Sequence, residues 1–178
     1  MVRVPGSVRV GAAWLLAVPF LLFARPTPLL LLVGGCVAAV GLAVRGWAAG
    51  CIAKGWTLTT WGAYAFTRNP MYLGSFAIGL GLTVIGGHWI WPSAFAAFFL
   101  AVYVPTMRRE AEWLSESFDD RFEEYAASVP VFFPRLSPFR SEATAAEGFQ
   151  WSRYVRHREW EALLGVGAAL VFLALKLR

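Results

Sequence analysis

Long apolar runs separated by short polar segments form the main pattern along this chain of 178 residues. A helix needs roughly 17–25 apolar residues to cross the hydrocarbon core of a bilayer. The runs that approach this length cover residues 8–24, 28–44, 71–87, 89–107 and 160–177. One such run alone also suits a buried helix of a soluble protein, but five in so short a chain favour a membrane protein. The pattern therefore predicts an all-α fold, a polytopic membrane bundle of about five transmembrane helices.

Short turn segments connect the runs. Residues 25–28, rich in Pro, follow the first run, and residues 86–88, Gly-Gly-His, separate the third from the fourth. Pro and Gly end helices and reverse the chain. Small residues also recur at four-residue spacing, as at Gly34 and Ala38, which lets helix backbones approach closely. This spacing predicts close packing inside the bundle, with a dimer contact as the alternative, and leaves the oligomeric state open.

A polar segment with an apolar stripe follows the fourth run. Residues 108–127 carry acids and Arg121 on one face, and the stripe on the other face consists of Leu114, Phe118, Phe122 and Tyr125. This pattern predicts an amphipathic helix on the cytoplasmic side, lying along the membrane or against the bundle. Residues 129–138, rich in Pro and Phe, predict an irregular strap. Residues 151–160 mix Trp, Tyr and Arg, which is typical of an anchor at the membrane interface.

The basic residues are distributed unevenly between the two sides of the predicted membrane. If the five runs alternate in direction, the side of the N-terminus holds nearly all of the 16 Lys and Arg residues. Such residues accumulate on the cytoplasmic side. We therefore expect an integral protein of the bacterial inner membrane with its N-terminus in the cytoplasm. Basic residues beside the spans also account for the net charge of +5, and no nucleic-acid partner is expected.

The composition agrees with this interpretation. Hydrophobic residues make up 58% of the chain and charged residues 15%, against roughly 25% charged residues in a typical soluble domain. Cys36 and Cys51 form no disulfide framework, so free thiols in a reducing compartment are expected. We expect residues 1–178 to form a single domain. Its chemical motifs lie in residues 45–135, and an interfacial segment with the last span occupies residues 149–178.

Candidate chemistry begins at residues 68–74, Arg-Asn-Pro-Met-Tyr-Leu-Gly. Asn69 suits a helix N-cap and Pro70 the first helical position, so the third span is expected to begin there. The free N–H groups of a helix N-terminus attract anions, and Arg68 beside them can bind a carboxylate or phosphate through two N–H groups. Tyr72, one turn into the helix, can reach the same pocket. A capped helix with an interfacial Arg is the alternative interpretation.

A second polar group follows the fourth run. Glu110 and Glu112 come directly after its apolar part. The third and fourth runs are similar in length and joined by a tight turn. They therefore form a hairpin that returns both acids to the membrane face that holds Arg68. Two acids on a solvated helix are the alternative.

These residues form a recognisable combination. Its elements are Lys54, then Gly62-Ala63-Tyr64, then residues 68–74, then Glu110 and Glu112, then Phe118 and Tyr125, and finally Val129-Pro130 with Pro134. The combination resembles the isoprenylcysteine carboxyl methyltransferase and phospholipid methyltransferase superfamily of integral membrane methyltransferases. The resemblance covers about residues 45–135. It implies a small bundle of membrane helices that binds S-adenosylmethionine at its cytosolic side and takes a lipophilic acceptor from the bilayer.

Residue by residue, the resemblance implies a cofactor-binding set that consists of Lys54, Tyr64, Arg68, Asn69, Pro70, Met71, Tyr72, Gly74 and Glu110. It implies catalytic roles for Arg68, Glu110 and Glu112, and no metal. Five positions depart from the family pattern. Asn69 replaces the usual His, and Ser128 replaces a basic residue that often holds the substrate carboxylate. Ala63 replaces a Pro, Asp119 replaces a Gly, and Ala111 splits the pair of Glu residues. A prenylcysteine carboxylate, a lipid amine and other lipids all remain open as the methyl acceptor.

The implied methyl transfer requires little chemical activation by the protein. A sulfonium methyl group is already electrophilic, so the enzyme must mainly align the acceptor and exclude water. An amine acceptor must also lose a proton, which Glu110 or Glu112 can take, although cofactor binding is the favoured role of these acids. One alternative is an NADPH-dependent membrane reductase of the sterol type, in which Met71 and Ser75 would replace the usual Asn and Glu. The other is a non-catalytic membrane protein that retains the fold.

Overall fold

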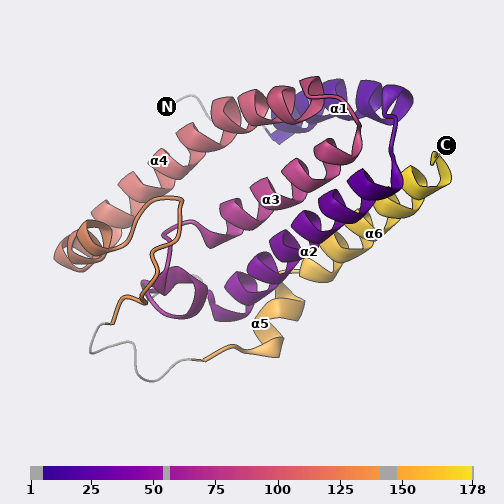
Figure 1. Ribbon diagram of the computed structural model, residues 1–178. Coiled ribbons are helices and arrows are strands. Elements are labelled where there is room, and N and C mark those ends of the chain that lie inside the picture. Colours follow the sequence, from indigo (N-terminus) through magenta and orange to yellow (C-terminus); the bar gives the residue numbers. More distant parts are fainter. Residues whose placement is uncertain (1–5, 54–56, 141–147, 178) are drawn as a thin grey trace.

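The computed structural model describes residues 6–53, 57–140 and 148–177, with only the backbone given for residues 6–14. Within these ranges the chain is helical and contains no strand. The elements are α1 (Gly6–Phe23), α2 (Pro28–Cys51), η1 (Gly62–Ala65), α3 (Pro70–Ile85), α4 (Ile90–Ser128), α5 (Trp151–Arg156) and α6 (Glu159–Leu175). In Figure 1, α2 lies beside α3, α6 packs along α2, and α4 runs along α3 and past α1.

The helices agree with the predicted runs, with one difference. α1, α2, α3 and α6 each begin within about two residues of a predicted run. Residues 89–107 and 108–127 were expected to form a span and a separate amphipathic helix. In the structure both belong to α4, which covers 39 residues and continues as a helix past residue 107. No glycine interrupts the helix at that junction, and Pro105 lies inside it without ending it. The break comes later, at Asp119, where φ is 44° and ψ is −128°.

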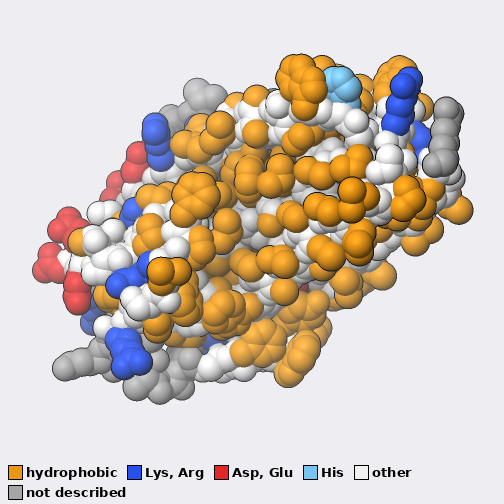
Figure 2. Space-filling view, in the orientation of Figure 1, with side chains coloured by type: hydrophobic (Ala, Val, Ile, Leu, Met, Phe, Trp, Pro, Cys, Tyr) orange, Lys and Arg blue, Asp and Glu red, His pale blue; other side chains and the backbone are white. Residues whose placement is uncertain are grey.

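Two of the described helices, α2 and α4, are long and apolar enough to cross a membrane. Only 17% and 11% of their most apolar windows are buried inside the molecule, so most of this apolar surface faces outward. Figure 2 shows hydrophobic side chains covering the middle of one face, with acidic side chains gathered at its left-hand end and basic side chains at both ends. An exposed apolar surface of this kind marks contact with lipid or with another protein, and it is consistent with membrane association. The number of five crossings stays a prediction.

Glycines set the close contact between α2 and α3. A Cβ atom added at Gly81 would lie 2.4 Å from the Gly34 carbonyl oxygen, and one added at Gly41 would lie 2.6 Å from the Gly74 carbonyl oxygen. The small residues Gly34 and Ala38 therefore lie in a helix contact inside the molecule, as their spacing predicted. A residue with a Cβ atom would clash at Gly81 or Gly41, because the two backbones approach so closely there.

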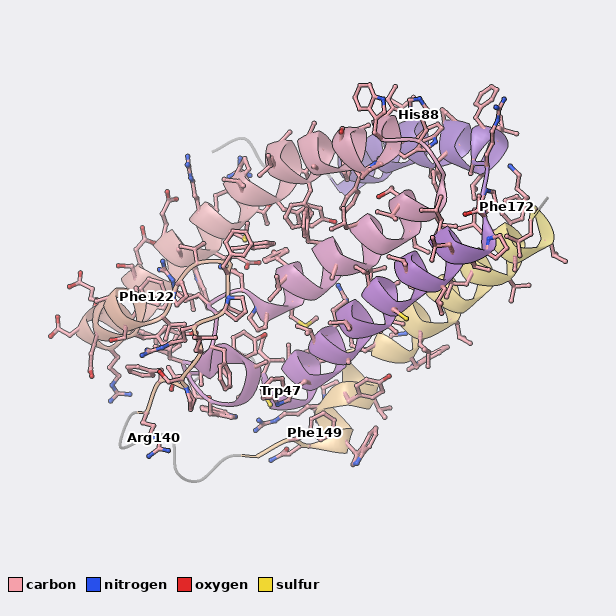
Figure 3. All side chains as sticks on the ribbon, in the orientation of Figure 1. Trp47, His88, Phe122, Arg140, Phe149 and Phe172 are labelled. Carbon is pink, nitrogen blue, oxygen red and sulfur yellow. The ribbon has the colours of Figure 1, made fainter. Side chains whose placement is uncertain are left out.

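The two hairpin turns meet at one end of the molecule. The backbone N–H of Arg25 donates to the Gly86 carbonyl at 3.0 Å, which joins the α1–α2 turn to the α3–α4 turn. In Figure 3, His88 and Phe172 lie at this end, whereas Phe122 and Phe149 lie toward the opposite end. The C-terminus of α2, the N-terminus of α3 and the second half of α4 therefore converge at the opposite end, as the predicted hairpins require.

The strap, residues 129–139, lies against residues 65–69, which we call the motif loop. The N–H of Arg68 donates to the Pro130 carbonyl, that of Arg135 to the Phe66 carbonyl and that of Phe139 to the Ala65 carbonyl, each at 2.9 Å. These bonds satisfy backbone groups of two segments that lack regular structure. The strap thereby holds the loop that leads into α3.

The second half of α4 packs its apolar stripe against the same region. Phe122, Tyr125 and Val129 form a buried cluster, and Leu114 and Phe118 pack against it. The Tyr125 hydroxyl also donates to the Tyr64 carbonyl at 2.8 Å. The stripe predicted from the sequence thus faces the protein, and the acids on the other face are exposed.

Candidate functional site

The motif loop is held to the strap by side chains as well as by its backbone. The Thr67 hydroxyl donates to the Phe132 carbonyl at 2.9 Å, and the Asn69 Nδ2 donates to the Val131 carbonyl at 2.9 Å. Asn69 occupies the N-cap position of α3, and its own carbonyl accepts from the Leu73 N–H at 3.0 Å. Its side chain makes no capping bond. The expected helix start is therefore correct, but the amide of Asn69 binds the strap instead of the helix.

Tyr72 and Glu110 connect α3 to α4. The Tyr72 hydroxyl donates to Glu110 Oε1 at 2.8 Å, a bond strengthened by the charge of the carboxylate. The ring of Tyr103 stacks edge-on against that of Tyr72 with centroids 5.5 Å apart. This geometry brings the two motifs together, as the hairpin argument predicted. Of the two acids, only Glu110 borders a cavity, because Glu112 lines neither of the two cavities described below.

A cavity of about 660 Å³, which we call the main cavity, opens where these elements meet. Its walls come from the ends of α2 and α3, the motif loop, α4 and the joint between α5 and α6. Its polar lining consists of Arg45, Thr57, Thr59, Tyr64, Arg68, Asn69, Tyr72, Ser75, Tyr103, Glu110, Tyr125 and His157. Arginine side chains and hydrogen-bond acceptors therefore line the same cavity, as a ligand with charged and polar groups requires.

Arg68 has a buried hydrogen-bond donor without a partner among the described residues. Its Nε is buried, and no group among the described residues accepts a hydrogen bond from it. A buried donor without a partner costs free energy, roughly 1–3 kcal/mol, and such groups are rare in folded proteins. Other atoms of Arg68 border the main cavity, so the residue contributes positive charge to that wall although its Nε is closed off.

Tyr64 contributes a neutral group to the same wall. Burial is the main reason that the pKa of its phenol lies above the usual value, and the neighbouring Tyr125 adds to the effect. The hydroxyl therefore stays protonated at physiological pH. It can act as a hydrogen-bond donor or acceptor and does not act as a base there.

A second cavity of about 510 Å³ adjoins the first, and we call it the phenylalanine cavity. The rings of Phe76, Phe99 and Phe132 pack together in it, with centroids 4.9 Å apart for the first two. Both cavities share the wall formed by Arg68, Asn69, Glu110, Leu114 and Tyr125. The site thus combines a cavity that holds many polar groups with a more apolar one, and Arg68, Asn69 and Glu110 lie in the wall between them.

The remaining residues implied by the resemblance lie in different places. Pro70 and Met71 line the main cavity. Gly74 lines neither cavity and lies at the contact between α2 and α3, where an added Cβ atom would come within 2.7 Å of the Gly41 carbonyl oxygen. Lys54 lies outside the described residues. These roles in binding stay predictions.

Sequence reasoning missed part of the cavity wall. Arg45 lies at the end of the second apolar run and His157 within the predicted interface anchor, residues 151–160, and both line the main cavity. Ser75 and Tyr103 line it as well. A lone charge at the end of an apolar run was the available signal for Arg45. No local pattern marks His157, because the fold of the last helices brings it there.

Fold and site together define a helical protein with two candidate membrane-spanning helices and two cavities that share a wall at one end of the bundle. The chain belongs to the phospholipid methyltransferase family, whose model matches residues 29–121. The matched stretch contains α2, α3 and most of α4, and with them Arg68, Tyr72 and Glu110. It excludes α5 and α6.

Three relatives extend this result. The nickel-cobalt-cadmium resistance protein NccN of Alcaligenes xylosoxydans xylosoxydans is 36% identical over 64% of this chain and 52% of its own. The cobalt-zinc-cadmium resistance protein CzcN of Cupriavidus metallidurans is 35% identical over 66% of this chain and 55% of its own. The protein-S-isoprenylcysteine O-methyltransferase of Schizosaccharomyces pombe is 30% identical over 44% of this chain and 34% of its own. The chain thus spans about half the length of the first two relatives.

Two further comparisons bear on the site. No solved structure matches the chain. Two of the relatives are named for metal resistance, but the described part of this chain holds no group of three or more His, Cys, Asp and Glu residues placed to bind a metal ion.

Proposed function

We propose that the protein transfers a methyl group from S-adenosylmethionine to a lipophilic acceptor at the cytoplasmic face of the membrane. The observation that carries this proposal is the shared wall of the two cavities. Arg68 and Glu110 border both the main cavity and the phenylalanine cavity. A polar cofactor and a lipid-soluble acceptor can therefore meet at the same residues.

The main cavity fits such a cofactor in its chemistry. S-Adenosylmethionine carries a carboxylate, an ammonium group, ribose hydroxyls and a purine, and when bound it supplies an electrophilic methyl group. The guanidinium groups of Arg45 and Arg68 at the cavity wall suit the carboxylate and other hydrogen-bond acceptors of the cofactor. Glu110, held by Tyr72, suits hydroxyl or ammonium donors. The aromatic rings of Tyr72 and Tyr103 offer faces to a cation or a purine.

The protein residues would act mainly by positioning. The Tyr72–Glu110 bond fixes the carboxylate between the two cavities, and the strap fixes Arg68 through its backbone N–H. A preorganised site of this kind lowers the barrier by holding the reacting groups in place. For an amine acceptor, Glu110 can also take the proton that must be lost.

The phenylalanine cavity is the proposed site of the acceptor. Its lining is largely aromatic and aliphatic, and Leu100, which lines it, is 60% exposed on the outer face of α4. A lipid chain can therefore enter from the bilayer side. A prenylcysteine and an aminophospholipid are the acceptors to test. In this proposal membrane lipids surround α2 and α4 and lie next to the entrance of the phenylalanine cavity.

The decisive experiment compares the two neighbouring acids. Purified protein in detergent is titrated calorimetrically with S-adenosylhomocysteine, the demethylated cofactor. Glu110→Gln is expected to weaken binding about tenfold because it removes a charged acceptor. Glu112→Gln, a matched change on an exposed acid outside both cavities, should leave affinity unchanged. Binding of NADPH without binding of S-adenosylhomocysteine would favour a reductase and refute the proposal.

A further inference from the structure

One guanidinium group joins three helices beside the main cavity. Arg45 on α2 donates from Nε and Nη2 to the two carboxylate oxygens of Glu159 on α6, at 2.9 and 2.8 Å. Its Nη1 donates to the hydroxyl of Ser75 on α3. Such a two-bond contact fixes the orientation of the guanidinium plane as well as its position.

The ion pair separates two cavities. Arg45 lines the main cavity, whereas Glu159 lines a further cavity of about 510 Å³ beside Trp47 and Phe149. Glu159 is only 6% exposed and the side chain of Arg45 is 23% exposed. The carboxylate is thus enclosed behind the arginine, and the arginine keeps one side open to the main cavity.

Gly74, the last residue of the motif, gives Arg45 its space. A Cβ atom added at Gly74 would lie 2.5 Å from Arg45 Cγ and 3.0 Å from the Arg45 backbone nitrogen. The arginine side chain therefore runs directly over the glycine toward Ser75. This contact explains why a motif glycine that lines neither cavity still affects the site.

Arg45 retains unused hydrogen-bonding capacity. A guanidinium carries five N–H donors, and the bonds to Glu159 and Ser75 use one on each nitrogen. The two remaining donors belong to Nη1 and Nη2. Because Glu159 neutralises much of the charge, the pair can stay buried in the ligand-free protein. It can still offer directed N–H groups to an anion.

We propose that Arg45 binds the carboxylate of the ligand of the main cavity and that Glu159 positions it. The inference rests on the proposed function, which supplies a ligand with such a carboxylate. It gives α6, which lies outside the matched family region of residues 29–121, a direct part in cofactor specificity. Arg68, at the wall shared with the phenylalanine cavity, is left for groups nearer the acceptor.

The test measures discrimination between two ligands on the full chain in detergent. Calorimetry gives the dissociation constants for S-adenosylhomocysteine and for its decarboxylated analogue, which keeps the amine. Wild-type protein should favour the carboxylate form about tenfold, equivalent to about 1.4 kcal/mol. The double variant Arg45→Gln/Glu159→Gln should lose this preference. Removing both partners leaves no unpaired buried charge, so this variant is expected to fold.

Controls separate specificity from structure. Glu161→Gln alters an acid on α6 that is 48% exposed and paired with Arg158, and it should keep the wild-type ratio. Glu159→Gln alone should reduce the ratio. A folded double variant that binds with an unchanged ratio, or a ratio lost only in Arg68→Gln, would overturn the inference and leave the proposed function standing. Failure of wild-type protein to bind either ligand would overturn both.

Discussion

The contact between α2 and α3 leads to a quantitative prediction for Gly81→Ala. The added methyl group would lie 2.4 Å from the Gly34 carbonyl oxygen and 2.7 Å from the Ala38 backbone nitrogen. Both atoms belong to backbone and cannot rotate away. Relief up to ordinary contact, which begins at 3.4 Å, requires the helices to separate by about 1 Å. The separation would loosen contacts along the whole pair.

The size of the effect follows from two opposing contributions. Overpacking of a tight contact costs about 1–3 kcal/mol, and the rigid backbone on both sides places this site toward the upper end. The better helix propensity of Ala offsets up to about 1 kcal/mol. The net loss of stability is about 2 kcal/mol, which for a chain of this size lowers the melting temperature by roughly 4–8 °C.

The assay is thermal unfolding in detergent, followed by tryptophan fluorescence. Gly167→Ala is the matched control, since a Cβ atom at Gly167 on α6 meets nothing within 4 Å among the described residues. This control should melt at or slightly above the wild-type temperature. A melting temperature of Gly81→Ala within about 1 °C of the wild-type value would refute the close contact between α2 and α3.

Three further outcomes are expected. Leu100→Trp should fill the phenylalanine cavity and raise the apparent KM for a lipid acceptor without changing the affinity for the cofactor. The control Leu164→Trp changes an exposed residue of α6 outside the cavities and should leave the KM unchanged. Equal effects of the two variants would exclude this cavity as the acceptor site. Burial raises the pKa of Tyr64, so above about pH 10 the unfolded chain loses this proton while the folded chain keeps it. The free energy of unfolding should therefore fall as the pH rises beyond that value. Thermal melts should show a smaller fall in Tyr64→Phe. Impermeant thiol reagents outside the cell should label His88→Cys and miss Leu136→Cys in a cysteine-free background; the reverse would place the site on the outer face.

Local sequence signals predicted the helix starts and the meeting of the two motifs. Asn69-Pro70 marks the start of α3 because both residues suit the first turn of a helix. Equal run lengths on either side of a tight turn were enough to bring Glu110 back beside Tyr72. The packing of Gly34 and Ala38 followed from their spacing. These inferences needed only local residue preferences, the spacing of small residues and the lengths of the apolar runs.

The parts that failed or were missed depend on contacts between distant segments. The Asn69 amide was expected to cap α3, but it binds Val131, 62 residues further along. Arg45 and Glu159 are 114 residues apart, and nothing in either neighbourhood indicates the other. The predicted boundary between the fourth span and the amphipathic helix was wrong, because an apolar run that turns polar does not by itself end a helix. The break lies at Asp119.

The hydrogen bonds between the motif loop and the strap set an order for assembly during synthesis. The N-terminal segments of a membrane protein leave the ribosome first, so α2 and α3 can pair before the strap exists. The motif loop obtains its acceptors at Pro130 and Val131 only after all of α4 has been made. Arg45 obtains its carboxylate later still, when α6 arrives. The wall of the main cavity is therefore complete only at the end of synthesis, and a chain still lacking α6 would leave Arg45 without the carboxylate that orients it.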